Sequence, residues 1–396
     1  MFERIDMAPP DAILGLTETF KGDPRPGKIN LGVGIYKDAK NQTPVFDSVK
    51  QAEARLLEQE STKSYLPISG APEYGAAVRE MVFGGNSEVV SAKRAVTVHT
   101  PGGTAALRVA GDFLKKHLPS ARIWVSTPTW ANHVGIFRAA GLDVETYPYY
   151  DADGKCLAFD AMTAALREVP AGDVVLFHAC CHNPTGMDPD TAQWKVLAEI
   201  AAERGFLPFF DFAYQGLGDG LEADAAGVRT FCRSGCELLV ASSFSKNFGL
   251  YNERVGALTL VAPDPDAAAR CFSQLKTSVR TNYSNPPSHG GAIVTTIFAD
   301  PALHAQWKSE VAAMRDRING MRSAFVEGLE KCGVERDFSF ITRQRGMFSF
   351  SGLNKAQVER LKEEFAIYIV GSGRINVAAI TPDNLDALCK ALAAVL

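Results

Sequence analysis

The stretch Leu238-Leu-Val-Ala-Ser-Ser-Phe-Ser-Lys246, which continues as Asn247-Phe-Gly-Leu-Tyr-Asn-Glu-Arg254, is the part of the chain that most clearly decides the fold. It begins as an apolar run typical of a buried strand and ends in hydroxyls, a lysine and an arginine. Polar side chains at the carboxyl end of a strand are typical of ligand sites in α/β proteins. We therefore expect the rest of the chain to supply the other strands of such a sheet.

Strands and helices alternate through the middle of the chain. Helical patterns occur at residues 104–116 and 191–204, between apolar runs that predict strands. This alternation predicts an α/β fold with a mostly parallel, seven-stranded sheet covered by helices on both faces. The last two strands are joined by a segment too short for a helical crossover, so we expect the final strand to be antiparallel. The predicted strands are residues 95–100, 123–126, 144–149, 174–180, 207–212, 238–243 and 257–261.

The pattern changes after residue 300. Apolar residues recur every three or four positions from Leu303 to Leu329, which predicts one long amphipathic helix ending near Gly333. Shorter helices and strand-like pieces follow it. We therefore expect a second, smaller α+β domain, built from the C-terminal part of the chain and some N-terminal residues.

Composition narrows the class of protein. The 396 residues carry a net charge of -4 without a long run of one sign, which argues against nucleic acid or an anionic membrane as a partner. The eight cysteines have no disulfide-framework spacing, which favours a reducing compartment. The N-terminus has no apolar core of signal-peptide length, and no later stretch is apolar enough to span a bilayer. We expect a cytoplasmic protein.

Lys246 is the first candidate for chemistry. Ser243, Ser245 and Arg254 are suited to holding an anion such as a phosphate. A partly desolvated lysine beside cationic groups has a lowered pKa, which is the condition for a lysine that forms a Schiff base. The alternative interpretation is a surface lysine in a polar turn.

Two further segments suit the same kind of site. Asp211 lies inside the apolar run Leu207-Pro-Phe-Phe-Asp-Phe-Ala-Tyr214, where a carboxylate needs a cationic partner such as a protonated ring nitrogen. A helix N-cap or an internal salt bridge is the alternative. The glycine turn Thr100-Pro-Gly-Gly-Thr-Ala105 lies between a strand and a helix, and it lets a phosphate approach backbone N–H groups. Glycine turns before helices are common, so this segment is weak by itself.

The segment His178-Ala-Cys-Cys-His-Asn-Pro-Thr-Gly186 raises the hypothesis of a metal site. We expect no metal there, because Cys180 and Cys181 would point to opposite faces of a strand and no second pair of ligands is evident. Asn183 lies in a turn at a strand end and is a candidate hydrogen-bond donor. Arg374 and Arg280 are each either a solvated surface charge or a fork that binds a carboxylate.

Together these segments resemble the aspartate/aromatic aminotransferase family, of pyridoxal-phosphate fold type I. The likeness runs from Ile13-Leu-Gly-Leu16 to Ser372-Gly-Arg374. Its most specific motifs are Cys181-His-Asn-Pro-Thr-Gly186, Asp211-Phe-Ala-Tyr-Gln-Gly216 and the stretch from Ser243 to Arg254. The resemblance implies an N-terminal arm (1–12) lying on a partner subunit, a small domain (13–43 and 314–396) and a large cofactor-binding domain (44–313). It also implies a homodimer with shared active sites.

The resemblance assigns roles around a pyridoxal 5'-phosphate cofactor. Lys246 would hold the cofactor as a Schiff base and then move a proton between the substrate Cα and the cofactor. Asp211 would pair with the ring nitrogen, supported by His133, and Trp130 would stack on the ring. Tyr214 and Asn183 would hydrogen-bond the phenolic oxygen of the ring. The phosphate would be held by Gly103, Thr104, Ser243, Ser245 and Arg254, and by the partner subunit's Tyr65.

The same resemblance implies the substrates. Arg374, near the backbone of Gly34, would bind the substrate α-carboxylate, with Trp130 and Asn183 also lining the substrate site. Arg280 of the partner subunit would bind a side-chain carboxylate. The predicted reaction is ping-pong transamination between aspartate and 2-oxoglutarate. An aromatic aminotransferase of dual specificity is the nearest alternative. A cofactor-binding regulatory protein and a metalloprotein using the residues from His178 to His182 are alternatives of other classes.

Overall fold

The computed structural model describes residues 1–8 and 14–396, and the chain divides into two compact units. The larger unit comprises residues 44–316, and the smaller joins residues 1–43 to residues 317–396. The boundary predicted between residues 313 and 314 thus lies three residues before the division seen here. Residues 9–12 of the predicted N-terminal arm, and Ile13, lie outside the described residues.

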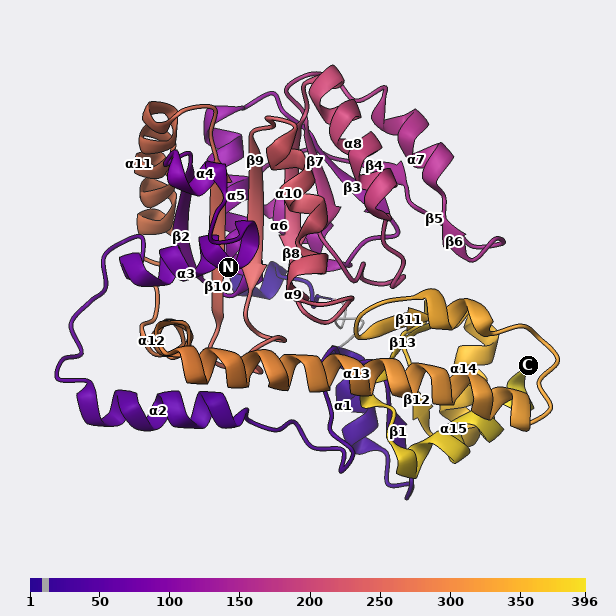
Figure 1. Ribbon diagram of the computed structural model, residues 1–396. Helices are drawn as coiled ribbons and strands as arrows, with labels where there is room; N and C mark the ends of the chain where they lie inside the picture. Colours follow the sequence, from indigo (N-terminus) through magenta and orange to yellow (C-terminus); the bar gives the residue numbers. More distant parts are fainter. Residues whose placement is uncertain (9–13) are drawn as a thin grey trace. The chain divides into compact units, whose positions relative to one another are not determined.

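A seven-stranded sheet forms the centre of the larger unit (Figure 1). The strand order is β2-β10-β9-β8-β7-β3-β4. Neighbouring strands are parallel from β9 to β4, whereas β10 is antiparallel to both β2 and β9. The predicted mostly parallel sheet with an antiparallel final strand is therefore confirmed. The strands are β2 (Ala95–Pro101), β3 (Ile123–Thr127), β4 (Val144–Pro148), β7 (Val174–His178), β8 (Leu207–Phe212), β9 (Leu238–Ser243) and β10 (Val255–Val261).

Helices connect these strands and cover the sheet (Figure 1). Local sequence sets their ends: Asp190 and Gln193 form a capping box at the start of α8, and Gly205 ends that helix in the left-handed conformation. The helices are α2 (Asp47–Gln59), α3 (Pro72–Phe83), α4 (Glu88–Ser91), α5 (Gly103–His117), α6 (Asn132–Ala139), α7 (Phe159–Leu166), α8 (Thr191–Arg204), α9 (Leu221–Asp224), α10 (Ala226–Arg233), α11 (Pro265–Asn282) and α12 (His289–Ala299). A short hairpin pairs β5 (Tyr150–Asp151) with β6 (Cys156–Leu157).

The sheet is buried on both faces, as adjacent phenylalanines of β8 illustrate. Phe209 belongs to the core cluster that β2, β3 and β7 share with α5, α6 and α11. Phe210 points to the other face, where its ring packs near Trp194 of α8 and Phe231 of α10. Successive side chains of a strand point to opposite faces. The largely apolar sequence of β8 is therefore explained by helices on both sides of the sheet.

The smaller unit combines helices with two short two-stranded sheets. β1 (Ile29–Asn30) pairs in parallel with β12 (Ile367–Tyr368), and β11 (Phe348–Phe350) pairs antiparallel with β13 (Arg374–Asn376). Its helices include α1 (Leu14–Gly22), α14 (Lys355–Phe365) and α15 (Pro382–Val395). The long helix predicted after residue 300 is α13 (Pro301–Lys331), whose residues 301–316 belong to the larger unit and 317–331 to the smaller.

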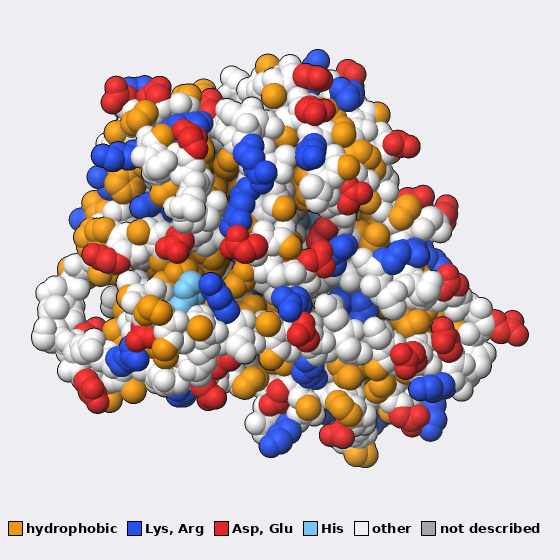
Figure 2. Space-filling model, viewed as in Figure 1, with side chains coloured by type: hydrophobic (Ala, Val, Ile, Leu, Met, Phe, Trp, Pro, Cys, Tyr) orange, Lys and Arg blue, Asp and Glu red, His pale blue; other side chains and the backbone are white. Residues whose placement is uncertain are grey.

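Charges of both signs are interspersed on the face of the molecule shown in Figure 2, which accords with the modest net charge of -4. Among the described helices, none is both long and apolar enough to cross a membrane.

Candidate active site

The topology of the sheet brings the predicted site residues of the larger unit to one edge. Trp130, Asn183 and Asp211 lie at or just beyond the carboxyl ends of β3, β7 and β8. Lys246 follows β9 by three residues. Because β10 is antiparallel, its amino end meets the same edge, and Arg254 immediately precedes it. Residues that are far apart in sequence therefore converge on one pocket, lined by Gly103, Thr104, Leu107, Trp130, Asn183, Asp211, Ala213, Tyr214, Ser243, Ser245, Lys246 and Arg254.

Lys246 and Asp211 are the ionisable pair of this pocket. Burial lowers the pKa of Lys246, and the positive charge of Arg254 acts in the same direction, whereas Asp211 opposes them. Burial alone would raise the pKa of Asp211, but its hydrogen bond with His133 and nearby positive charges lower the pKa overall. Nε2 of the buried His133 lies 2.9 Å from Oδ2 of Asp211. Asp211 is thus held as an anion by a histidine rather than serving as a helix cap.

A glycine turn and two serines form an anion cradle at one end of the pocket. Gly102 has a φ of +83°, and α5 begins at Gly103, so the turn presents the free N–H groups of a helix N-terminus. A Cβ on Gly102 would lie 2.5 Å from Nη2 of Arg254, which leaves no room for a side chain between the turn and the guanidinium. The hydroxyl of Ser243 donates to that of Ser245 over 3.2 Å. These N–H, hydroxyl and guanidinium groups suit a phosphate.

Aromatic and amide groups border the space between Lys246 and the cradle. The side-chain amide of Asn183 donates to the hydroxyl of Tyr214 over 3.5 Å. Nζ of Lys246 lies 5.1 Å from the centre of the Tyr214 ring. Two apolar lining residues, Leu107 and Ala213, were not predicted from the sequence. Leu107 lies two residues after the glycine turn, and Ala213 lies within the motif from Asp211 to Gly216, but an apolar side chain carries no signal for a site.

Two predicted residues of the larger unit do not line this pocket. Tyr65 is 92% exposed. Arg280 is exposed near the end of α11 and donates to the hydroxyl of Ser284 over 2.5 Å. Both had been assigned to the active site of a partner subunit, so their separation from the pocket of their own chain leaves that prediction in place.

In the smaller unit, Arg374 and Gly34 gather around one ring. Arg374 is 3% exposed, and its guanidinium lies 4.1 Å from the centre of the Phe348 ring. Its Nη2 donates to the carbonyl of Gly32 over 2.6 Å. A Cβ on Gly34 would lie 2.7 Å from Phe348 Cζ, so this backbone also passes close to the ring. Arg374 is therefore not the solvated surface charge that was the alternative interpretation.

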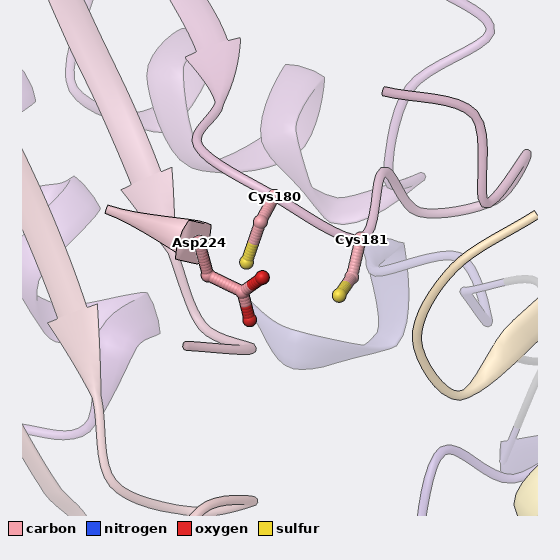
Figure 3. Close-up of side chains that lie close together, drawn as sticks. All are labelled: Cys180, Cys181 and Asp224. Atoms are coloured by element: carbon pink, nitrogen blue, oxygen red, sulfur yellow. The ribbon is translucent and has the colours of Figure 1, made fainter. Parts of the chain in front are cut away.

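The prediction that Cys180 and Cys181 point to opposite faces of a strand is wrong. β7 ends at His178, and Cys181 adopts a φ of +53°, so the two cysteines do not alternate as on a strand. Both sulfurs instead point toward the carboxylate of Asp224 (Figure 3). The sulfurs and a carboxylate oxygen are all within 4.8 Å of one another. Asp224 was not considered from the sequence, because it is more than 40 residues away.

A roomier cavity lies at the amino ends of the strands. It has a volume of about 580 Å³ and is lined by residues such as Gly172, Gly205 and Gly235, which precede β7, β8 and β9. Ligands of open α/β sheets bind at the carboxyl ends of the strands. We therefore place the active site in the pocket that contains Lys246.

The chain belongs to the class I and II aminotransferase family, whose model matches residues 26–392. It is 59% identical to the aspartate aminotransferase of Salmonella typhi and 58% identical to that of Escherichia coli (strain K12), in both cases over 396 residues and all of each chain. A crystal structure of an aromatic-amino-acid aminotransferase from Burkholderia pseudomallei, covalently bound to pyridoxal phosphate, is 50% identical. Its TM-score is 0.98, and the match covers 100% of this chain and 99% of that one. The predicted family and fold class are confirmed.

Proposed function

We propose that this protein is a pyridoxal-phosphate-dependent aspartate aminotransferase, which converts aspartate and 2-oxoglutarate into oxaloacetate and glutamate. The observation that carries the proposal is the single pocket in which Lys246 and the His133-supported Asp211 lie beside an anion cradle. The identity of 59% with an aspartate aminotransferase over the whole chain supports the choice of amino acid.

The donor set of the pocket fits pyridoxal phosphate. Gly103, Thr104, Ser243, Ser245 and Arg254 would hold the phosphate through N–H, hydroxyl and guanidinium groups. Asp211 would accept a hydrogen bond from the ring nitrogen. Trp130 would cover the face of the ring, and Asn183 and Tyr214 would donate to its phenolic oxygen. Leu107 and Ala213 contribute apolar wall.

When bound, the cofactor supplies a protonated ring that accepts the electron pair left on the substrate Cα. Asp211 maintains that protonation, because its carboxylate is held ionised by His133. Lys246 holds the cofactor covalently through Nζ until substrate arrives. Once released, the amine would take the proton from Cα as a general base and deliver it to the cofactor carbon to which Nζ had been joined. The lowered pKa of Lys246 favours the neutral amine that this step needs.

The reaction proceeds in two halves with one substrate bound at a time. In the first half, aspartate would give up its amino group to the cofactor and, with uptake of one water molecule, depart as oxaloacetate. In the second half, 2-oxoglutarate would take the amino group, with release of one water molecule, and depart as glutamate. Lys246 would then move the proton in the opposite direction. Initial rates should therefore give the parallel double-reciprocal lines of a ping-pong enzyme.

Arginines bind the two carboxylates of the substrate in this proposal. Arg374 binds the α-carboxylate, with Gly34, Trp130 and Asn183 lining the same site. The packing of the Arg374 guanidinium on Phe348 supports this role, because it holds the planar fork in one orientation. Arg280 of the partner subunit binds the side-chain carboxylate. Its exposure in its own chain leaves it available to another subunit.

The protein functions as a cytoplasmic homodimer in this proposal, with Tyr65 and Arg280 each completing the site of the partner. Large apolar side chains are exposed near the N-terminus and in α2, which suits burial against a second copy of the chain. Examples are Phe2 at 83%, Met7 at 97% and Leu57 at 86% exposed. The cysteines accord with a reducing compartment, because none of the eight forms a disulfide.

An aromatic aminotransferase of dual specificity is the second candidate, supported by the Burkholderia pseudomallei enzyme at 50% identity. Measuring kcat/KM for aspartate and for phenylalanine, with 2-oxoglutarate as the common acceptor, distinguishes the two. We expect aspartate to be preferred by at least ~10-fold, the discrimination that one additional charged contact supports. Equal values would favour the dual-specificity enzyme, and turnover of neither substrate would reject both.

A further inference from the structure

His99, in β2, lies where two segments of the larger unit meet. We define the Tyr65 segment as residues 65–70 and the Arg280 segment as residues 280–291. In the proposed function, each of them carries a residue that enters the active site of the partner subunit. The two segments are far apart in the chain, so only the fold brings them together at β2.

The backbone of His99 binds one segment with each of its polar groups. Its N–H donates to the carbonyl of Ser69 over 2.9 Å, and its carbonyl accepts the hydroxyl of Tyr283 over 2.8 Å. β2 is the end strand of the sheet beside β10, and alternate residues of an antiparallel pair direct both backbone groups away from the neighbouring strand. Such outward groups need partners from elsewhere in the chain. At His99 the two segments supply those partners.

The imidazole of His99 separates the same two segments. A Cβ on Gly70 would lie 2.5 Å from Cβ of His99 and 3.3 Å from its Nδ1. A Cβ on Gly291, in α12, would lie 2.6 Å from Cε1 of the ring. The side chain is 1% exposed, and the ring centre lies 4.2 Å from that of Tyr74 in α3. The imidazole therefore fills a closed space between the Tyr65 segment, the Arg280 segment and α3.

The side chain of His99 acts through its volume. Neither ring nitrogen has a hydrogen-bond partner among the described residues, so the contacts of the ring are packing contacts. Protein interiors are close-packed, and a shorter side chain here would leave a cavity that the flanking segments reduce by moving. The side-chain amide of Asn285 donates to the carbonyl of Leu66 over 3.1 Å, so movement of one segment also affects the other.

We propose that His99 is a positioning residue that holds Tyr65 and Arg280 in place for the partner's active site, an inference that rests on the proposed function. In that function, Tyr65 contacts the phosphate of the partner's cofactor and Arg280 contacts the side-chain carboxylate of the partner's substrate. Neither takes part in the proton transfer by Lys246. Loss of the imidazole between the segments should therefore weaken the binding of cofactor and dicarboxylate and leave the proton-transfer step nearly intact.

Steady-state kinetics of His99→Ala test the proposal. With cofactor in excess, we expect KM for aspartate to rise at least ~10-fold and kcat to stay within about 2-fold of the wild-type value, because a binding group is misplaced and the base is not. KM for alanine, which lacks a side-chain carboxylate, should change far less. The cofactor should also dissociate faster when the holoenzyme is diluted, as its near-visible absorption reports. His99→Gln, which is similar in size, should restore KM for aspartate to within about 3-fold of wild type.

Thr97→Ala is the matched control. Thr97 lies two positions earlier on the same face of β2 and is 4% exposed, but its hydroxyl pairs with that of Thr259 in β10 rather than with either segment. This variant should lose stability, with KM for aspartate and release of the cofactor unchanged. An unchanged KM in His99→Ala, or an equal rise in Thr97→Ala, would overturn the proposal.

Amide hydrogen exchange separates failure of this proposal from failure of the proposed function. In His99→Ala, the Tyr65 segment and the Arg280 segment should exchange faster than in the wild type and in Thr97→Ala, whichever substrates the protein accepts. A wild-type protein without aminotransferase activity would reject the proposed function. Unchanged exchange of both segments in His99→Ala would reject the positioning role.

Discussion

At the scale of single residues, Lys246 carries the most specific prediction. We expect Lys246→Ala to retain the cofactor through the phosphate cradle but to lower kcat by a factor of about 10²–10⁴ or more, because the base that moves the proton is gone. Steady-state rates and the near-visible absorption of the bound cofactor measure the two properties. Lys276→Ala, which removes a lysine packed over Phe272 of α11, is the control and should keep wild-type activity. Undiminished turnover in Lys246→Ala would end this assignment.

The burial of the His99 side chain determines how we expect the stability of the folded protein to depend on pH. Its side chain is 1% exposed, and neither ring nitrogen has a hydrogen-bond partner among the described residues. The ring centre lies 4.2 Å from that of Tyr74, and the hydroxyl of Tyr283 donates to the His99 carbonyl. Burial lowers the pKa of His99 from 6.5 to about 4. The imidazole is therefore buried in its neutral form.

The sign of the effect follows from linkage. Between pH 6.5 and about 4, His99 binds a proton in the unfolded chain but remains neutral in the folded chain. The free energy of unfolding therefore falls as the pH is lowered through this range. The loss is on the order of 3 kcal/mol at the acid end. We expect His99→Gln to reduce the fall in melting temperature between pH 6.5 and 4. His117→Gln, at the exposed end of α5, is the control, and equal slopes for His99→Gln and the wild type would contradict the prediction.

At the scale of elements, we predict that alanine substitutions at two glycines of α13 change the stability of the protein in opposite directions. A Cβ on Gly320 has nothing within 4 Å, whereas one on Gly328 would lie 2.6 Å from Sγ of Cys389 in α15. Gly320→Ala should stabilise the protein by up to ~1 kcal/mol, because it lowers the entropy of the unfolded chain and improves helix propensity. Gly328→Ala should destabilise it by about 1–3 kcal/mol through overpacking. Thermal unfolding measures both, and a rise in melting temperature for Gly328→Ala would show that α15 gives way easily.

Most elements were predictable from local pattern. The bounds of α8, β8 and β9 coincide with the predicted ranges, because apolar periodicity and capping residues act within the element itself. The strand predicted at 174–180 was two residues too long. Ala179 and Cys180 are apolar and buried like the strand before them, so pattern alone does not reveal that the backbone turns away from the sheet there.

At the scale of the whole molecule, a substitution of Arg280 tests which residue selects aspartate over a neutral amino acid. We expect Arg280→Asp to lower kcat/KM for aspartate by at least ~100-fold and to change that for a neutral amino acid much less, because a carboxylate then faces a carboxylate. Arg270→Asp, elsewhere on α11, is the control and should leave both values unchanged. An equal loss for both kinds of substrate would instead assign Arg280 a structural role.

Mixing two inactive variants tests whether active sites are shared. A heterodimer of Lys246→Ala and Arg280→Asp chains contains one site with both wild-type residues only if Arg280 crosses to the partner. Unfolding and refolding the two variants together should therefore restore about a quarter of the wild-type sites for aspartate, the fraction expected from random pairing of two chains. If both residues served the site of their own chain, no activity above that of the separate variants would appear.

The sequence by itself determined the α/β class, the antiparallel last strand, the long α13 and most residues of the cofactor pocket. Strand and helix patterns are local to each element. A parallel sheet also places the carboxyl ends of its strands, with their polar residues, at one edge regardless of loop conformation. The support of Asp211 by His133 was implied by the family resemblance, and the 2.9 Å contact between them confirms it. Only the tertiary structure decided two other meetings of distant groups: the approach of Arg254 to Gly102, and the gathering of Asp224 with Cys180 and Cys181. Those contacts depend on chain reversals of tens of residues, for which no spacing rule exists in the sequence.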